Sequence, residues 1–335
     1  MSSQHDPVRF GIIGLGVGKS RVKQAATTAG AQLVAVCDLQ EELAQAQAAE
    51  YGCEWHTDHR ALLERQDIDA VGIFTPSGTH GDLAIESLQA GKHTFTTKPM
   101  DVTTAKIDQV LAAAEESGQL LAVDFQRRYE LSTRLIKQAI DAGRLGRPIF
   151  GDFRLKWYRA DSYFAGGNPP GWRGTWQYDG GGSAANQGIH GIDQTLWFMG
   201  PVQSVRARIN IFNHDIETED ALEALVTYAS GAWGIIQTTT TVYGGLGHEH
   251  EIHGTDGTIQ MRQEDITTWA FVDDPDGGLP DPAELPPGPN NIIEDMIGAL
   301  RDGKPVACTG QEGRRSVELL EAMYTSARED REVTL

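Results

Sequence analysis

The chain has 335 residues, of which 40% are hydrophobic and 22% charged, so it is long enough for two domains of a soluble globular protein. Its 28 Lys and Arg against 47 Asp and Glu give a net charge of −19, which argues against nucleic acid or an anionic membrane as a partner. No apolar run approaches the roughly 20 residues that span a bilayer, and the polar first residues lack the apolar core of a signal peptide. We therefore expect a cytoplasmic protein with reduced cysteines (Cys37, Cys53 and Cys308).

Strand and helix patterns alternate over the first 125 residues. Helices separate short apolar strands, which we place at 8–14, 32–38, 68–74, 93–97 and 120–125. Apolar strands connected by helices are typical of a parallel, doubly wound sheet. The sequence therefore predicts an α/β domain over residues 1–126.

The pattern changes after about residue 145, where long strands dominate. We place these strands at 148–159, 202–212, 221–229 and 232–243. A Gly-, Pro- and Trp-rich loop (166–182) lies between the first two of them, and an acidic, Pro-rich connection (273–290) follows the last. We also predict three helices, at 183–199, 291–302 and 311–329. Long strands with few helices between them favour an antiparallel or mixed sheet. We therefore predict a second, α+β domain over residues 127–335.

The stretch GLGVGKS after the first strand ends like a P-loop and begins like a dinucleotide-binding turn. The P-loop pattern GxxxxGK[ST] requires a glycine where Ile13 stands, inside the predicted strand. That pattern therefore fails, and ATP binding is disfavoured.

The dinucleotide pattern G-x-G-x-x-G is met at its first two glycines. Gly14 and Gly16 fit, whereas Lys19 occupies the third position and Gly18 lies one residue early. The first glycine makes a tight turn, and the second lets the backbone approach a pyrophosphate at the following helix N-terminus. We predict that this turn, which also includes Val17, binds the cofactor phosphates.

Asp38 ends the second strand about 20 residues after the turn. A carboxylate at that place accepts hydrogen bonds from the adenosine ribose hydroxyls, and it would repel the 2′-phosphate of NADP. The next two residues, Leu39 and Gln40, add no arginine. The sequence therefore favours NAD over NADP, with a helix cap as the alternative role for Asp38.

Three further stretches, TPSGTH (75–80), AGKHTFTTKPM (90–100) and DGGGSAANQGIHGID (179–193), together resemble the Gfo/Idh/MocA oxidoreductase family. The resemblance extends to the closing helix that ends in YTSARED. It implies a Rossmann domain followed by a domain with a large open sheet, which commonly pairs with another subunit in a homodimer or homotetramer. The implied activity is an NAD-dependent dehydrogenase that oxidises a secondary hydroxyl of a sugar, cyclitol or sugar derivative.

The EKP motif of the family reads Thr97-Lys98-Pro99 here. Lys98 ends a parallel strand, where ligands bind in such sheets, and a lysine there can stabilise a developing alkoxide. Thr97 replaces the glutamate of the family, which leaves the electrostatic tuning of Lys98 open. The residue before Pro99 should be extended, and the family often has a cis bond there.

The second family motif, D-x-x-x-H-x-x-D, reads here from Asn186 through His190 to Asp193. These positions share one face of a helix. The ordinary pKa of an imidazole suits His190 to accept a hydroxyl proton near neutral pH. Asn186 cannot titrate, so we expect it to position the substrate, and Asp193 to contact substrate, to orient His190 or to cap local structure.

The resemblance implies further site residues. It assigns Arg127 to the substrate and seven other positions to the cofactor, namely Thr75, Pro76, His80, Thr97, Gln126, Trp172 and Arg173. A loop anchored by tryptophans is the alternative interpretation of Trp172 and Arg173, and an acidic partner is the alternative for Arg127.

The stretch HEHEIH (248–253) looks like a metal cluster. On a strand, however, His248 and His250 share one face and the two glutamates take the other. We interpret it as a polar strand face and predict no metal.

The resulting hypothesis is oxidation of a ring hydroxyl, with His190 as the base and Lys98 as the stabiliser of the oxyanion. One alternative is a redox glycosidase on the same fold, in which transient oxidation activates elimination of a glycosidic bond. A non-catalytic NAD-binding regulator is disfavoured, because both Lys98 and His190 are present.

Overall fold

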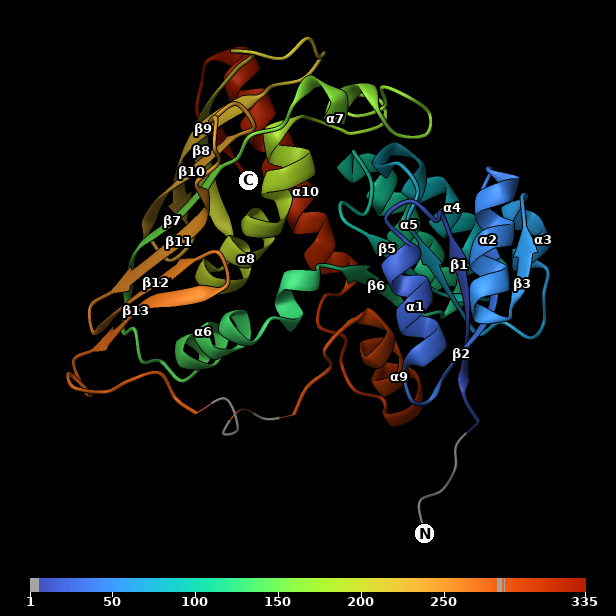
Figure 1. The fold of residues 1–335 in the computed structure, drawn as a ribbon. Helices are drawn as coiled ribbons and strands as arrows, with labels where there is room; N and C mark the ends of the chain where they lie inside the picture. The colour runs from blue at the N-terminus through green and yellow to red at the C-terminus, as the bar shows by residue number, and fades with distance from the viewer. Residues whose placement is uncertain (1–5, 282–284, 286) are drawn as a thin grey trace. The chain divides into compact units, whose positions relative to one another are not determined.

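The computed structural model describes residues 6–281, 285 and 287–335, and Figure 1 shows their fold. The chain divides into two compact units. The first comprises residues 1–101, 105–126 and 288–313, and the second comprises 102–104, 127–287 and 314–335. The sequence predicts one division, after Gln126, whereas residues 102–104 group with the second unit and residues 288–313 with the first.

The first unit contains a six-stranded, fully parallel sheet with the strand order β3-β2-β1-β4-β5-β6. Its strands are β1 (Val8–Ile13), β2 (Ala31–Cys37), β3 (Glu54–His56), β4 (Ala70–Ile73), β5 (His93–Thr97) and β6 (Leu121–Asp124). Its helices are α1 (Lys19–Thr27), α2 (Glu41–Tyr51), α3 (His59–Leu63), η1 (Ser77–Thr79), α4 (His80–Gln89), α5 (Thr104–Ser117) and α9 (Ile292–Asp302). Helices cover both faces of this sheet (Figure 1), as predicted for a doubly wound fold.

The strand order of the first sheet reverses between β1 and β4, because β2 follows β1 on one side and β4 lies on the other. In doubly wound sheets such a switch point leaves a crevice at the carboxyl ends of the strands, where ligands bind. The core beneath it is aromatic: Phe10 and Phe74 both meet the ring of Phe95 edge-on, with centroids 6.2 and 6.0 Å away. The dinucleotide turn follows β1, directly at the switch point.

The segment that contains α9 packs on the first unit through backbone contacts. The amide of Val123 donates to the carbonyl of Cys308 at 3.0 Å, and the guanidinium of Arg301 donates to the carbonyl of Gly30 at 3.2 Å. These bonds join positions that are far apart in the chain, 271 residues in the case of Gly30 and Arg301, and no local sequence pattern encodes them. The predicted assignment of both closing helices to the second domain is therefore corrected for α9.

The second unit contains an eight-stranded sheet with the strand order β13-β12-β11-β7-β10-β9-β8-β14. Its strands are β7 (Pro148–Lys156), β8 (Val202–Asn210), β9 (Ala221–Tyr228), β10 (Trp233–Thr239), β11 (Gly247–Gly254), β12 (Gly257–Arg262), β13 (Asp265–Phe271) and β14 (Val333–Thr334). All strand pairs are antiparallel except β7 with β10. The predicted, mainly antiparallel sheet is thus confirmed, with β12, β13 and β14 as additions.

The remaining elements are η2 (Gln126–Tyr129), α6 (Leu131–Asp141), α7 (Asp161–Ala165), the π-helical turn η3 (Ser183–Gly188), α8 (Ile189–Met199) and α10 (Gly310–Glu329). They belong to the second unit except for Gln126 and residues 310–313, which belong to the first. Both α6 and α8 lie on one face of the large sheet (Figure 1). Helix α8 approaches β7 so closely that a Cβ on Gly191 would lie 2.0 Å from the ring of Phe153. The predicted helix over 183–199 therefore exists, but its first turn is π-helical.

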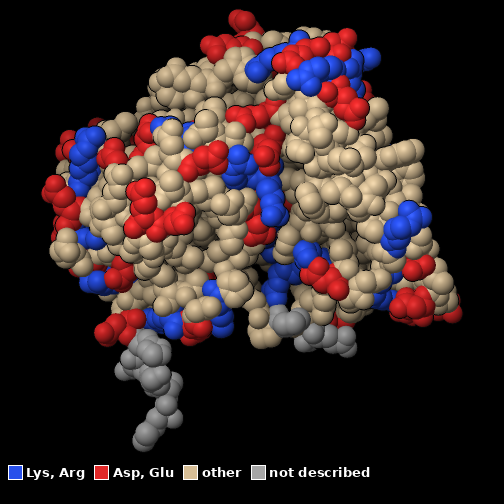
Figure 2. Space-filling view, turned by 180° about the vertical axis from the view of Figure 1, so that it is seen from behind, with Lys and Arg blue, Asp and Glu red and all other residues tan. Residues whose placement is uncertain are grey.

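On the face drawn in Figure 2, basic side chains are interspersed with acidic ones and form no continuous basic surface. Within residues 6–281 and 287–335, no helix combines the length and the hydropathy that a bilayer crossing requires. The predicted acidic connection (273–290) lies partly outside the described residues.

Candidate active site

The turn after β1 is so tight that two of its glycines cannot accept a side chain. Gly14 has φ +87°, and a Cβ there would lie 2.6 Å from the carbonyl of Phe74. A Cβ on Gly18, the residue that caps α1, would lie 2.1 Å from the carbonyl oxygen of Gly14. Gly18 therefore permits the close packing of helix on strand that the third glycine of the motif normally permits. Lys19, at the expected position of that glycine, is exposed.

Gly16 is different, because no atom lies within 4 Å of the position of its Cβ. Both Gly16 and Val17 are exposed, and no side chain caps the N-terminus of α1. The first amides of α1 are thus left for a ligand, and the missing side chain at Gly16 gives an anion access to the backbone. This cradle fits the pyrophosphate of a dinucleotide.

The carboxylate of Asp38 joins the end of β2 to the glycine turn. One oxygen accepts from the amide of Leu15 at 2.8 Å, and the other accepts from the amide of Gln40 at 2.9 Å. Each carboxylate oxygen has a second lone pair, so both can still accept a ribose hydroxyl. The cap of α2 is Gln40, whose side chain makes no capping bond, so Asp38 is not the predicted alternative of a helix cap.

Lys98 follows β5 at the same edge of the sheet as the glycine turn, and its peptide bond to Pro99 is cis. The neighbouring backbone is held by His80, which is fully buried. Its Nδ1 lies 2.8 Å from the carbonyl oxygen of Pro99, and its Nε2 lies 2.7 Å from that of Thr75. His80 therefore ties the loop after β4 to the backbone beside Lys98.

The burial of His80 differs from its predicted contact with the cofactor. Carbonyl oxygens only accept hydrogen bonds, so a neutral imidazole satisfies one of the two and a protonated imidazole satisfies both. Burial lowers the pKa of His80, whereas the two carbonyls act in the opposite direction. Both ring nitrogens face the protein, so His80 supports the site without reaching a ligand.

Gln126 lies exposed after β6 and is connected to the start of α1. Its side-chain oxygen accepts from Arg21 at 3.0 Å, and Arg21 forms an ion pair with Asp124 at 2.6 Å. The side chains of Arg21 and Asp124 are 12% and 1% exposed, respectively. This pair fixes the first turn of α1 against β6 and leaves Gln126 at the edge that carries Gly16 and Lys98.

In the second unit, Asn186 is held by side chains from three segments. Its Oδ1 accepts from the hydroxyl of Tyr163 at 2.8 Å and from Nε2 of Gln187 at 2.6 Å. Its Nδ2 donates to Asp179 at 2.5 Å, and the other oxygen of Asp179 accepts from the amide of Gly174 at 2.9 Å. These partners define which side of the amide is oxygen, so Asn186 has one fixed orientation.

A buried carboxylate anchors the π-helical turn that bears Asn186. Glu219 accepts from the amides of Gly182 and Ala184 at 2.8 and 2.9 Å and from the hydroxyl of Tyr324 at 3.2 Å. Burial raises the pKa of Glu219 from its ordinary 4.5 to about 7, while the hydrogen bonds from the two amides oppose that rise. π-helical turns are frequent at functional sites, and this one leads directly into the helix of His190.

Three residues of this unit were not found from the sequence, namely Tyr163, Asp179 and Glu219. Their partners lie 23, 7 and 37 residues away along the chain. Asp179 begins the family stretch DGGGSAANQGIHGID and could have been singled out there. Tyr163 and Glu219 lie in segments without any recognisable spacing.

The predicted polar face of Asn186, His190 and Asp193 is divided in the structure. Asn186 and His190 are half-buried, whereas Asp193 is 1% exposed and forms a two-pronged ion pair with Arg128, at 2.8 and 2.7 Å. Asp193 therefore holds α8 to the segment after β6 and does not face a ligand. The π-helical turn changes the helical phase before His190, so the simple i, i+4, i+7 spacing does not hold.

Arg127 also differs from its predicted contact with substrate. It is 7% exposed, and its guanidinium donates to Gln194 at 3.4 Å within the buried layer under α8. Burial lowers the pKa of Arg127, while the charge of Glu130 raises it. This residue is part of the interior of the second unit.

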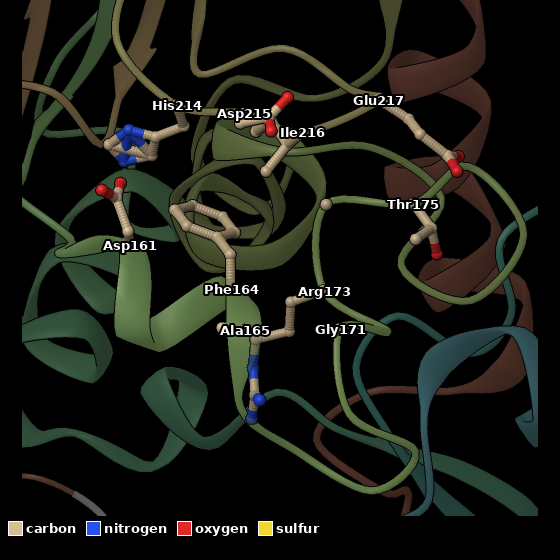
Figure 3. A pocket seen from close by; sticks show the side chains of 11 residues that line it. Asp161, Phe164, Ala165, Gly171, Arg173, Thr175, His214, Asp215, Ile216 and Glu217 are labelled. Atoms are coloured by element: carbon tan, nitrogen blue, oxygen red, sulfur yellow. The ribbon is translucent and has the colours of Figure 1, made fainter.

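Of the predicted pair Trp172 and Arg173, Arg173 lines a cavity of about 550 Å³ in the second unit (Figure 3). The guanidinium carbon of Arg173 lies 4.6 Å from the centre of the Trp172 ring. Apolar side chains of Phe164 and Ile216 line the cavity together with three carboxylates and an imidazole, those of Asp161, Asp215, Glu217 and His214. In Figure 3, Asp161 and His214 point toward one another.

The histidines of the stretch 248–253 behave as a strand face. His248 and His250 point into the unit, where His250 stacks on Phe153 with centroids 4.8 Å apart, and the two glutamates form outward ion pairs. Among the residues that the structure describes, no three His, Cys, Asp or Glu side chains are arranged to hold a metal ion.

Comparison with known families matches both units. Residues 8–125 match the model described as "Oxidoreductase family, NAD-binding Rossmann fold", and residues 133–260 match the "GFO/IDH/MocA C-terminal domain". The chain belongs to the Gfo/Idh/MocA oxidoreductase family. Gly14 to Gly18 and Asp38 lie within the first match, and Asn186 and His190 lie within the second.

Two curated relatives place the chain within the Gfo/Idh/MocA family more closely. The inositol 2-dehydrogenase of Rhizobium meliloti is 28% identical, over 98% of this chain and 99% of that protein. The scyllo-inositol 2-dehydrogenase (NAD(+)) of Bacillus subtilis is 31% identical, over 78% of this chain and 76% of that protein.

A solved structure agrees in fold as well as in sequence. The WlbA dehydrogenase from Bordetella pertussis, in complex with NADH and UDP-GlcNAcA, superposes with a TM-score of 0.88 at 31% identity, covering 98% of this chain and 99% of that one. The comparisons confirm the predicted Gfo/Idh/MocA family, the NAD cofactor and a dehydrogenase activity on sugar or cyclitol hydroxyls.

Proposed function

We propose that this enzyme oxidises a ring hydroxyl of a sugar derivative, with Lys98, His190 and Asn186 as the residues that act on that hydroxyl. The observation that carries this proposal is the edge of the first sheet, where Lys98 after β5 lies at the same end of the strands as the cradle at Gly16 and the carboxylate of Asp38. Full-length relatives that act on inositol, and one that binds UDP-GlcNAcA, support a polyhydroxylated ring as the substrate.

The proposed roles follow from side-chain chemistry. The imidazole of His190 accepts the hydroxyl proton, which is general base catalysis. The ammonium of Lys98 donates to the oxygen as it becomes an alkoxide, and so stabilises negative charge where it develops. Asn186, fixed by Tyr163 and Asp179, positions a neighbouring hydroxyl of the ring. NAD, when bound, supplies the hydride acceptor that the oxidation requires.

A Lys98→Met variant tests this assignment. We expect kcat to fall about 10²–10³-fold, because the alkoxide loses its donor, while the Kd for NADH stays unchanged. Turnover is measured as formation of reduced cofactor in a screen of sugars, sugar acids and cyclitols, with mass spectrometry of the product to detect bond cleavage. Lys23→Met, which changes an exposed lysine of α1, is the control. A Lys98→Met enzyme with near wild-type turnover would refute the proposed role.

We also propose that the bare face of the large sheet joins a second copy of the chain. Phe150, Trp233 and Leu225 are 43%, 63% and 62% exposed on neighbouring strands β7, β10 and β9, and the rings of Phe150 and Trp233 lie 6.4 Å apart. An apolar cluster of this kind on a sheet face is typical of an interface between subunits.

A Trp233→Glu variant tests the interface. We expect light scattering to show a lower mass than for the wild type, because the new carboxylate would be buried without a partner. Trp55→Glu, which changes a 38% exposed tryptophan on β3 of the first unit, should leave the mass unchanged. Equal masses for the wild type and Trp233→Glu would exclude this face.

A further inference from the structure

Two arginines of the second unit are stacked around one tyrosine beside Asn186. The guanidinium carbons of Arg159 and Arg173 lie 5.1 and 4.8 Å from the ring centre of Tyr163. Each also lies on a tryptophan, Arg159 at 4.7 Å from Trp157 and Arg173 at 4.6 Å from Trp172. Stacking of this kind fixes the planes of the guanidiniums and leaves their N–H groups directed outward from the edges. We call this pair the arginine clamp.

The clamp has no carboxylate partner among the residues that the structure describes, although the chain has 47 acidic residues. Arg159 donates to Gln187 at 3.0 Å, and its Nε is enclosed without any hydrogen-bond partner. Several other arginines of the molecule do form ion pairs, as in Arg9 with Asp69, Arg21 with Asp124, Arg128 with Asp193 and Arg154 with Glu251. Two like charges held against one ring repel one another, so the clamp favours an anion that neutralises both.

The clamp is connected to the proposed catalytic residues through direct contacts. Gln187, which accepts from Arg159, donates to the hydroxyl of Tyr163 and to Asn186, both at 2.6 Å. A single side chain, that of Gln187, therefore separates an anionic group bound to the clamp from Asn186, which positions the reacting ring.

The charges that line the adjoining cavity restrict where that anion can lie. Three carboxylates line it, those of Asp161, Asp215 and Glu217, against Arg173 as its one lining arginine. Carboxylates repel an anion, so the cavity does not favour an anionic group of its own. Neutral or hydroxylated parts of a ligand fit it better, between Phe164 and Ile216 (Figure 3).

We propose that the arginine clamp binds a carboxylate or phosphate group of the substrate, so that the substrate class is anionic sugar derivatives. This inference rests on the proposed function for the position of the reacting ring beside Asn186. Guanidinium groups bind carboxylate and phosphate through paired N–H donors, which suits both anions. We assign the bound anion to the substrate. The alternative outcome of the test is that the clamp binds an anionic group of the cofactor.

The experiment measures binding separately from turnover. Calorimetry on the NADH-loaded protein compares matched pairs of probes that differ only in charge, namely glucose with glucuronate, galactose with galacturonate, and glucose with glucose 1-phosphate. We expect at least one acidic member to bind about tenfold or more tightly than its neutral partner. Arg159→Met should remove that preference while the affinity for the neutral member stays unchanged, and Arg159→Lys should restore part of it.

Arg154→Met is the matched control, because it removes an arginine from strand β7, just before Arg159, that is already paired with Glu251 and Asp152. If no acidic probe binds more tightly than its neutral partner, the inference is overturned. It is also overturned if Arg159→Met and Arg173→Met weaken NADH instead, which would assign the anion to the cofactor. Acid-selective binding without any NAD reduction would support the clamp and refute the proposed function.

Discussion

The two units of this enzyme build their polar sites by opposite means. The first uses backbone: at its turn, Gly14, Gly16 and Gly18 shape the approach to free amides, and one carboxylate braces them. The second uses side chains: Asn186 is oriented by Tyr163 and by Asp179. A backbone cradle suits a cofactor that is common to a whole family, whereas side chains can be replaced one by one to suit a substrate.

The largest expected effect concerns the buried carboxylate of the second unit. The pKa of Glu219 is raised from 4.5 to about 7 in the folded protein, chiefly by burial, so the folded state holds this proton more tightly than the unfolded chain. The resulting stabilisation is complete below about pH 4.5 and is lost as the pH rises to about 7. By linkage the loss amounts to about 3 kcal/mol at most.

The measurement is the free energy of unfolding by urea for the wild type and Glu219→Gln, from about pH 5 to about pH 8. We expect the difference between them to move in favour of the variant as the pH rises, because only the wild type loses protonated Glu219. Glu130, whose pKa burial also raises to about 7, is present in both proteins and cancels. Parallel curves would show that Glu219 does not titrate in this range.

The glycines of the first unit provide a matched pair of substitutions. Gly18→Ala places a methyl group 2.1 Å from the carbonyl oxygen of Gly14, so we expect a loss of about 2 kcal/mol in stability along with weaker NADH binding. Gly16→Ala meets no atom within 4 Å, so its melting temperature should stay at the wild-type value while NADH binding weakens. Scanning fluorimetry and titration with NADH measure the two effects. A stable Gly18→Ala protein would contradict the close packing of α1 on β1.

The smallest expected effect is at the ribose end of the first unit. Asp38→Asn keeps an acceptor for Leu15 or Gln40 but removes the charge that would repel a 2′-phosphate. We expect the ratio of the Kd values for NADPH and NADH to fall by about tenfold, or about 1.4 kcal/mol. Glu41→Gln, which removes the same charge at an exposed position in the first turn of α2, is the control. An unchanged ratio would mean that Asp38 only accepts hydrogen bonds from the backbone amides of Leu15 and Gln40 and does not select the cofactor.

Much of the first unit could be predicted, because its signals are local. Apolar strands, the glycines after β1 and the carboxylate after β2 are each read within a short stretch, and the parallel sheet brings their carboxyl ends to one edge. The role of Gly18, which lies one residue before the expected third glycine, could be recognised only from the structure. Only the packing of Gly18 against the carbonyl of Gly14 shows that it takes the place of the third glycine of the motif.

The second unit was predictable in outline, and its site only in part. The family motif indicated Asn186, His190 and Asp193 as candidates on one helix face, but Asp193 is buried against Arg128, and a π-helical turn alters the helical phase between Asn186 and His190. Arg127 and His80 were assigned to ligands but are buried, and burial depends on neighbours distant in the chain.

The sequence by itself determined the class of this protein: a dinucleotide turn with its acidic partner, a lysine at a strand end and a histidine on a helix. Only the tertiary structure decided which polar side chains can meet a ligand and which are buried in pairs with one another. Asp193 is enclosed by Arg128, whereas Arg159 and Arg173 have no carboxylate partner within the part of the chain that the structure describes, and nothing in the chain order distinguishes the three. The physical reason is that an ion pair depends on distance in space, and Arg128 and Asp193 lie 65 residues apart in the chain.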